Sequence, residues 1–307
     1  MSVYATARIQ QLMGCVINQA VLPLVENSEV VEKVTKWLED EASREQYERE
    51  LVFMVLSGRI GGDNAIRYAG NVPLDEWAGA LKKVETMLAS GELPALAYPD
   101  NDNYVIRDSG YASLFILNQY QHSPFVMLRE GDVFLDCGAC CGDSAIWALS
   151  KGAGKVYSFE PDPEAIGYLR RNIARYGQGR TDIVMMGLGA ESGSMALSVK
   201  PGHIGSTRLI DAGEGVTVPV VALDDWLREN KVKPDFIKMD LEGSEVAALR
   251  GAQAAIVEYK PRLAICLYHR LSDMWVIPAM LKAMVPEYRF WCRKSHPVWE
   301  FVLYASI

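Results

Sequence analysis

The residues best suited to chemistry gather in one glycine-rich segment, Asp136-Cys-Gly-Ala-Cys-Cys-Gly142, which is followed by Asp143 and Ser144. Its glycines are spaced G-x-x-x-G, whereas a dinucleotide site uses G-x-G-x-x-G to seat a pyrophosphate on a helix N-terminus. Asp136 and Asp143 stand on both sides of the turn and would repel a pyrophosphate at close range. The same carboxylates would favour an ammonium, a sulfonium and ribose hydroxyls. The segment therefore predicts a site for S-adenosylmethionine (SAM) rather than NAD.

Each residue of this segment has an expected role toward the methionine portion of SAM. Gly138 and Gly142 let the backbone approach the ligand with no side chain in the way. Asp136 is expected to accept a hydrogen bond from the ammonium, directly or through water. Asp143 and Ser144 open the following helix and are predicted cofactor contacts, although Asp143 could equally complement the helix dipole.

Two more predicted cofactor contacts come after later strands. Ligands of an open parallel sheet bind beyond the carboxyl ends of its strands. Glu160 ends the second strand, where an acidic side chain can accept from both ribose hydroxyls. Leu188 follows the third strand and could cover the adenine face, although an ordinary core leucine is an equal alternative.

The predicted acceptor side is formed by residues that follow the fourth and fifth strands. An alcohol is a poor nucleophile at neutral pH, so a general base should assist methyl transfer. We expect His269 to act as the base and Asp240 to orient substrate, cofactor or base. No dedicated metal site is predicted, and the variant is a divalent cation held by Asp240 and Glu242. Arg270 and the loop residue His203 are predicted substrate contacts, although a lone loop histidine is often only solvated.

The six cysteines do not form a disulfide framework, because they are scattered through a large chain. Cys137 and Cys140 are formally a C-x-x-C pair. Redox or metal chemistry would need a lowered thiol pKa or a second ligand pair, and the neighbouring carboxylates act against the first. We interpret these thiols as reduced, small apolar residues of a tight turn.

Composition limits the classes of partner. The formal net charge is -8 over 307 residues, and half of the residues are apolar. An acidic chain has no electrostatic hold on nucleic acid or anionic lipid, so neither is an expected partner. No apolar run approaches the length of a membrane span. The apolar stretch 12–25 is expected to be a buried helix rather than a secretion signal, and a cytoplasmic location follows.

The predicted elements fall into two parts. Residues 1–100 are expected to be a helical cap or dimerisation region, so a homodimer is possible. Residues 101–307 are expected to be the SAM-dependent methyltransferase domain, since they contain the predicted SAM site and acceptor residues. Strands alternate with helices from Asp132 onward, and right-handed crossovers give a parallel sheet. The fold class is therefore α/β, Rossmann-like and mostly parallel, with a C-terminal hairpin. The expected strands cover residues 133–135, 155–159, 183–186, 235–239 and 262–267, and the hairpin covers 288–293 and 299–304.

With these residues in place, the chain resembles the FkbM family of SAM-dependent methyltransferases from Asp132 to the C-terminus. Three stretches carry the resemblance: Phe134–Asp143, Val156–Pro161 and Lys238–Glu245. It implies a class I methyltransferase sheet closed by an antiparallel hairpin. It also implies O-methylation of hydroxyls, often on sugars or natural products, so the acceptor would be a small molecule or a glycan.

The resemblance has limits. Arg293–His296 departs from a histidine-bearing strand end that is common in one branch of the family, and the helical N-terminal part matches no known pattern. Two other functions therefore stay open. One is a SAM-binding protein without turnover, and the other, which conflicts with the glycine spacing, is an NAD-dependent oxidoreductase.

Overall fold

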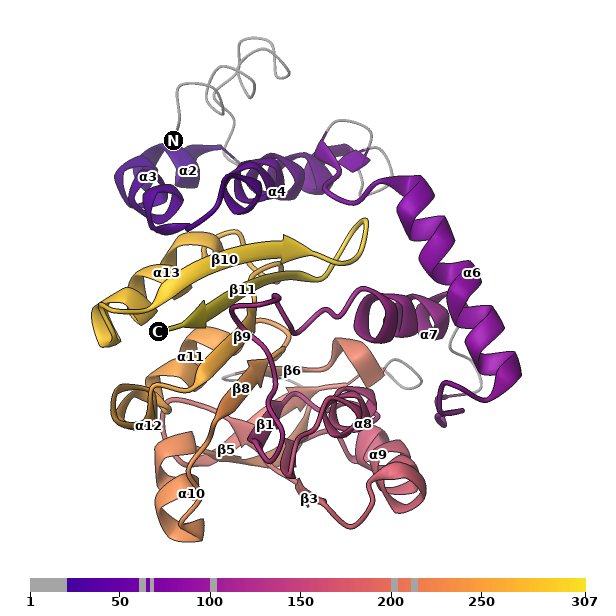
Figure 1. Ribbon diagram of the computed structural model, residues 1–307. Helices are drawn as coiled ribbons and strands as arrows, with labels where there is room; N and C mark the ends of the chain where they lie inside the picture. Colours follow the sequence, from indigo (N-terminus) through magenta and orange to yellow (C-terminus); the bar gives the residue numbers. More distant parts are fainter. Residues whose placement is uncertain (1–20, 61–64, 67–68, 100–103, 200–203, 211–214) are drawn as a thin grey trace.

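The computed structural model describes residues 21–60, 65–66, 69–99, 104–199, 204–210 and 215–307. Its centre is a seven-stranded sheet in the order β10-β11-β9-β8-β1-β2-β3, in which β11 runs antiparallel to both of its neighbours and the other pairs are parallel (Figure 1). The strands are β1 (Val133–Cys137), β2 (Lys155–Phe159), β3 (Thr181–Val184), β8 (Phe236–Met239), β9 (Arg262–Cys266), β10 (Arg289–Lys294) and β11 (Phe301–Ser306). This arrangement confirms the predicted fold class.

Alternating side chains of the strands bury both faces of the sheet, as expected of a sheet covered by helices on both sides. On one face, Leu135, Ile237 and Leu263 belong to a large core with the helices of the second half of the domain. On the other, Phe134, Val156 and Phe236 pack with Trp147. The helices are α8 (Asp143–Ser150), α9 (Pro163–Tyr176), α10 (Leu223–Asn230), α11 (Glu245–Arg250), α12 (Gln253–Tyr259) and α13 (Asp273–Met284).

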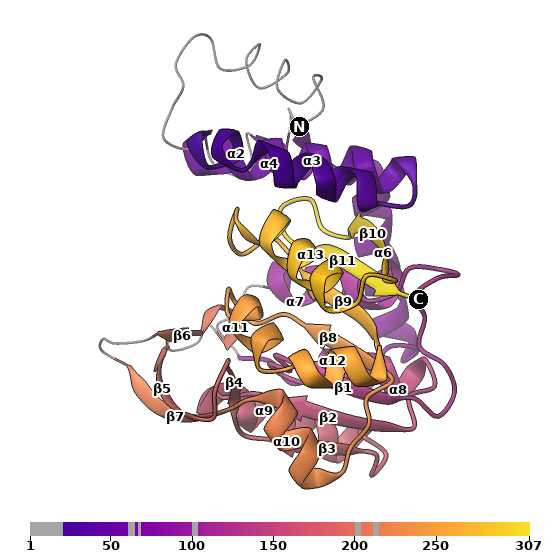
Figure 2. The same ribbon diagram turned by 90° about the vertical axis from the view of Figure 1, so that its left-hand side faces the viewer.

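The residues between β3 and α10 in the sequence form a second, smaller sheet, which was not expected from the sequence. Its strand order is β4-β7-β5-β6, from β4 (Gly187–Leu188), β5 (Gly193–Ser198), β6 (Arg208–Ile210) and β7 (Val216–Val221), with the short 3-10 helix η2 (Ile204–Ser206) before β6. Figure 2 shows this sheet projecting from the edge of the molecule near β4. Two of its strands, β4 and β6, have only two and three residues, and β5 and β7 are partly exposed.

The N-terminal part is helical, as predicted, and it packs directly on the sheet. It contains α2 (Leu22–Glu26), α3 (Ser28–Trp37), α4 (Glu41–Ile60) and α6 (Leu74–Ser90), followed by α7 (Tyr104–Tyr111) and the π-helix η1 (Ala112–Ile116). Helix α4 lies along β10, and α3 contacts α13 (Figures 1 and 2). Apolar side chains from these helices belong to the same core as the sheet, so residues 21–60 share a core with the domain that they cover. The predicted helix over 12–25 lies mainly outside the described residues.

Polar contacts also attach α4 to β10. Lys294 of β10 and Glu50 of α4 form an ion pair of 2.7 Å, and both side chains are only 1% exposed. Arg293 pairs with Asp40 at 2.8 Å, just before α4. The segment that departs from the family pattern is thus used to hold the N-terminal helices. None of the described helices has the length and apolar character needed to cross a bilayer.

Candidate active site

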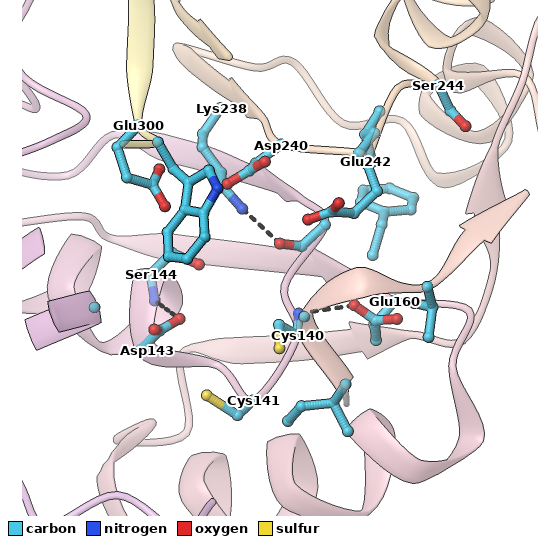
Figure 3. A pocket seen from close by; sticks show the side chains of 18 of the residues that line it. Cys140, Cys141, Asp143, Ser144, Glu160, Lys238, Asp240, Glu242, Ser244 and Glu300 are labelled. Carbon is cyan, nitrogen blue, oxygen red and sulfur yellow. Dashed lines mark hydrogen bonds between the residues drawn. The ribbon is translucent and has the colours of Figure 1, made fainter. Parts of the chain in front are cut away.

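A cavity of about 530 Å³ opens beyond the carboxyl ends of β1, β2, β8 and β9, a size typical of small-molecule sites. Residues of four regions line it: the segments before β1 that include Tyr98 and run from α7 to Tyr120, the strand ends of the main sheet, the small sheet with η2, and the turn between β10 and β11. Of the predicted site residues, the lining includes Gly138, Asp143, Ser144, Glu160, Leu188 and Asp240. Figure 3 shows Glu300, Asp240 and Glu242 along one side of this cavity and Asp143, Cys140 and Glu160 across from them.

The turn after β1 is built around Gly138. Its φ is +89°, and a Cβ at this position would lie 1.8 Å from the carbonyl oxygen of Asp240, so only glycine fits. Gly142 also has a φ of +89°, and a Cβ at this position would lie 2.6 Å from Leu169. Gly142 is not among the residues that line the cavity. Cys140 adopts a φ of +45°, which is uncommon for a residue with a side chain. The turn is thus held in one shape by close backbone packing.

Asp136 lies behind this turn and does not line the cavity. It is fully buried, 3.1 Å from the Lys238 ammonium, and it accepts hydrogen bonds from Ser144 at 2.8 Å and Ser158 at 3.4 Å. The predicted contact of Asp136 with the ligand ammonium does not fit this placement, because Lys238 already supplies its counter-ion. Asp143 does face the cavity and is the better-placed carboxylate.

Glu160 is held at the end of β2 by two backbone donors. Its Oε2 accepts from Cys140 N at 2.7 Å and its Oε1 from Asp162 N at 2.8 Å, which leaves a lone pair on each oxygen for a ligand. Burial raises the pKa of Glu160 to about 7, although these hydrogen bonds oppose the shift. Asp162 caps α9 by accepting from Glu164 N at 2.8 Å.

Asp240, at the end of β8, is positioned by two tyrosines. The Tyr120 hydroxyl donates to Oδ2 at 3.0 Å and the Tyr268 hydroxyl to Oδ1 at 3.1 Å. Because both tyrosines and Asp240 line the cavity, this carboxylate has a fixed orientation toward any molecule bound there.

His269 lies behind Asp240 and does not line the cavity. Its Nδ1 is 2.8 Å from the buried carboxylate of Glu245, and its Nε2 is 3.4 Å from Asp240 and 3.7 Å from Glu242. Burial lowers the pKa of His269, but Glu242, Glu245 and Asp240 together outweigh burial and raise this pKa well above its ordinary value. A raised pKa favours the protonated side chain, which has no lone pair to accept a proton. Since His269 also does not line the cavity, its position does not favour the predicted role as the base.

The variant with a divalent cation meets the same difficulty. Ligand atoms of Asp240, Glu242 and His269 lie within 4.8 Å of one another. A metal ion would have to replace the proton on the coordinating nitrogen of His269, and the same carboxylates raise the pKa of that side chain. The divalent cation therefore stays a variant of the prediction.

Two predicted substrate residues are not part of the described lining. Arg270 does not line the cavity; its side chain lies beside Gly243, 3.0 Å from where a Cβ would be. His203 lies outside the described residues.

The main omission of the sequence prediction is the turn between β10 and β11, which brings His296, Trp299 and Glu300 to the cavity. Glu300 has a φ of +61°, and the Gln119 amide donates to its carboxylate. Burial, followed by the charge of Asp240, raises the pKa of Glu300 well above its ordinary value. A non-glycine residue in the left-handed region at a cavity is a frequent mark of a functional site, but no sequence pattern reveals it.

The FkbM methyltransferase domain model matches residues 136–292, and the chain therefore belongs to this family. This agrees with the resemblance noted in its sequence.

Two curated relatives and one solved structure add to this assignment. The chain is 28% identical over 129 residues to hexuronic acid methyltransferase AglP of Haloferax volcanii, which covers 42% of this chain and 53% of that protein. It is 25% identical over 165 residues to methyltransferase 1 of Beauveria bassiana, covering 46% and 65%. The chain thus spans about half to two thirds of the length of these relatives. An FkbM methyltransferase from Methylobacillus flagellatus has the same fold, with a TM-score of 0.62 at 22% identity over 92% of this chain and 60% of that one.

Proposed function

We propose that the protein is a SAM-dependent methyltransferase that acts on a hydroxyl of a small molecule or glycan. One observation carries the proposal: a single cavity extends across the ends of four strands of the main sheet. At the ends of β1 and β2 its lining has carboxylates suited to a nucleoside, and at the ends of β8 and β9 it has hydrogen-bonding groups of fixed orientation. Membership of the FkbM family supports the same activity.

The described residues fit SAM. The Gly138 turn offers backbone groups to the methionine portion, and Asp143 faces the cavity where its ammonium would bind. Glu160 keeps acceptor capacity for the ribose hydroxyls. Leu188, only 1% exposed, contributes an apolar surface for the adenine. When bound, SAM supplies a methyl group activated by its sulfonium.

On the acceptor side, we propose that Asp240 accepts the hydrogen bond from the acceptor hydroxyl and takes its proton. Tyr120 and Tyr268 hold the two carboxylate oxygens of Asp240, and His269 Nε2 lies 3.4 Å from its Oδ1. His269 is thus a positioning residue that acts through Asp240. Positioning of this kind can supply several kcal/mol of a barrier reduction.

The test is release of S-adenosylhomocysteine from SAM with a panel of hydroxylated acceptors. We expect Asp240→Asn to lower kcat by about 100-fold or more, the usual contribution of a general base, while SAM affinity changes little. Glu258→Gln, which changes an exposed residue of α12, is the matched control and should leave both kcat and SAM affinity unchanged. Turnover by Asp240→Asn at the wild-type rate would exclude this base. SAM binding without turnover on any acceptor would instead favour a binding protein.

A further inference from the structure

The acceptor side of the cavity carries an excess of negative groups. Asp240, Glu242 and Glu300 all line it, and Figure 3 shows them side by side. Burial raises the pKa of both Glu242 and Glu300; His269 opposes the rise in both, and the charge of Asp240 adds to it. Carboxyl groups are therefore hard to ionise on this side of the cavity, and another anion placed among them would meet the same cost.

The cations near this side are already paired within the protein. His269, behind the lining, lies 3.4 Å from Asp240, 3.7 Å from Glu242 and 2.8 Å from Glu245. Lys238 is 2% exposed, pairs with the buried Asp136 and donates to the Gly138 carbonyl at 2.5 Å. Arg208 is the other cation of the described lining, and it comes from β6 beside Leu209, which lies against Gly187 of the small sheet. That position belongs to the side of the cavity formed by the small sheet.

The same turn supplies a flat aromatic surface. Trp299 is 49% exposed and lines the cavity. None of the other exposed large apolar side chains in the described parts of the chain lines it. Its indole stacks on the His296 ring, with the ring centroids 4.9 Å apart and an interplanar angle of 19°. On the same His296 ring, Trp77 of α6 packs edge-on with the centroids 4.7 Å apart. His296 Nδ1 accepts from Val298 N at 3.0 Å and Trp299 N at 3.1 Å, which fixes the stack.

We infer that the acceptor, if the proposed methyl transfer is correct, is a sugar-like ring that is neutral or positively charged, and that the site discriminates against uronic acids. The ring lies on Trp299, whose indole offers an apolar face for C–H groups. Its hydroxyl and ammonium groups reach Asp240, Glu242 and Glu300, to which they can donate hydrogen bonds. A sugar carboxylate can donate none and would add a like charge.

This specificity differs from that in the name of one relative, the hexuronic acid methyltransferase of Haloferax volcanii. The match with that protein covers 42% of this chain and therefore leaves most of this chain unmatched. Trp299 and Glu300 also lie beyond the residues that the family model matches, which end at 292. The C-terminal turn thus contributes Trp299 and Glu300 to this side of the cavity, whereas Asp240 and Glu242 lie within the matched domain.

The test uses the full chain, SAM and matched methyl pyranosides in the gluco, galacto and manno series, each as the neutral sugar, the 2-amino sugar and the uronate. Release of S-adenosylhomocysteine gives kcat/KM for each. We expect neutral and amino sugars to exceed the matched uronate by about 100-fold, since like-charge juxtaposition costs several kcal/mol. A uronate that equals or exceeds its neutral partner overturns the inference.

Two sets of variants separate charge from shape. Glu242→Gln and Glu300→Gln should each lower the ratio of kcat/KM for the neutral sugar to kcat/KM for the matched uronate by about tenfold. Glu258→Gln should leave this ratio unchanged. Trp299→Ala should lower kcat/KM for neutral sugars by about tenfold and Trp299→Phe should retain most of it, because an aromatic face is kept. Discrimination unaffected by either glutamine variant overturns the charge argument.

The remaining outcomes distinguish this inference from the proposed function. If the protein binds SAM but methylates no pyranoside in any series, the sugar-like acceptor is wrong and the methyltransferase proposal survives. If the protein does not bind SAM, the proposed function itself fails.

Discussion

At the scale of single residues, Glu160 provides a pH-dependent test of the cofactor site. Burial raises its pKa to about 7, and only the carboxylate can accept from both ribose hydroxyls. SAM should therefore bind the deprotonated protein. Above pH 7 its affinity should be constant, and as pH falls below 7 the affinity should drop by up to tenfold per unit.

Isothermal titration with SAM between pH 5.5 and 8.5 measures this dependence. Glu160→Gln should bind SAM more weakly and without the step near pH 7. A wild-type affinity that does not change between pH 6 and 8 would show that Glu160 does not hold the ligand as proposed.

His269 offers a second test, because its charge state separates a positioning residue from a base. Three carboxylates raise the pKa of His269 well above 6.5, whereas burial lowers the pKa of His122 and His296 to about 4. The stabilisation from a charged His269 is complete below the pKa of the unfolded chain and is lost as pH rises through its folded pKa.

Histidine NMR should therefore show an imidazolium signal for His269 throughout pH 6–8, with His122 and His296 neutral over the same range. The His269 signal is assigned by its absence from the spectrum of the His269→Gln variant. A His269 signal that titrates near 6.5 would restore the base predicted from the sequence.

How far single residues can be predicted from the sequence depends on where their partners lie. Gly138, Glu160 and Asp240 follow strands directly, so their arrival at one sheet edge follows from the α/β pattern. The burial of Asp136 depends on Lys238, 102 positions later, and strand pairing across β1 and β8 creates that contact. Glu300 reaches the cavity only through the left-handed turn after β10, which leaves no mark in residue type.

At the scale of elements, the turn between β1 and α8 depends on the absence of a side chain at Gly138. Gly138→Ala would put a Cβ 1.8 Å from the Asp240 carbonyl and would require a positive φ of alanine. We expect this variant to lose SAM binding or to fail to fold, because the strand end that carries Asp240 must move.

The matched control is Gly79→Ala in α6, where a Cβ meets nothing within 4 Å. Alanine in an exposed helix interior should stabilise the protein by about 0.5–1 kcal/mol. Thermal unfolding and SAM titration of both variants compare them. Normal SAM binding by Gly138→Ala would refute the close approach of the two strand ends.

The attachment of α4 to β10 can be tested through the buried pair of Lys294 and Glu50. Removal of one partner leaves a buried charge without a counter-ion and should cost about 3–5 kcal/mol in the free energy of unfolding. Lys294→Met and Glu50→Leu are therefore each expected to destabilise strongly, while the double variant should recover most of the loss.

Urea denaturation of the single and double variants gives the coupling between the two positions. Additive losses would show that the two charges do not interact, and would contradict the buried ion pair between α4 and β10. This attachment was beyond sequence reasoning: the helical periodicity of residues 41–60 predicts a helix but does not say which strand the helix covers.

At the scale of the whole molecule, the cavity is assembled from distant parts of the chain. Segments before β1, the strand ends of the main sheet, the small sheet and the C-terminal turn all contribute to its lining. The strongly periodic strands and helices after Asp132 made the main sheet predictable. The small sheet and the shared core of the N-terminal helices were not, since short exposed strands and helix–sheet packing have weak local signals.

The most direct test of this account is titration of the purified chain with SAM, S-adenosylhomocysteine and NAD under one set of conditions. The account predicts that both adenosyl ligands bind one site, that Glu160→Gln weakens both, and that NAD does not compete, because Asp143, Glu160 and Asp240 oppose a diphosphate. Binding of NAD in preference to SAM, or SAM affinity that is unaffected by Glu160→Gln, would contradict it.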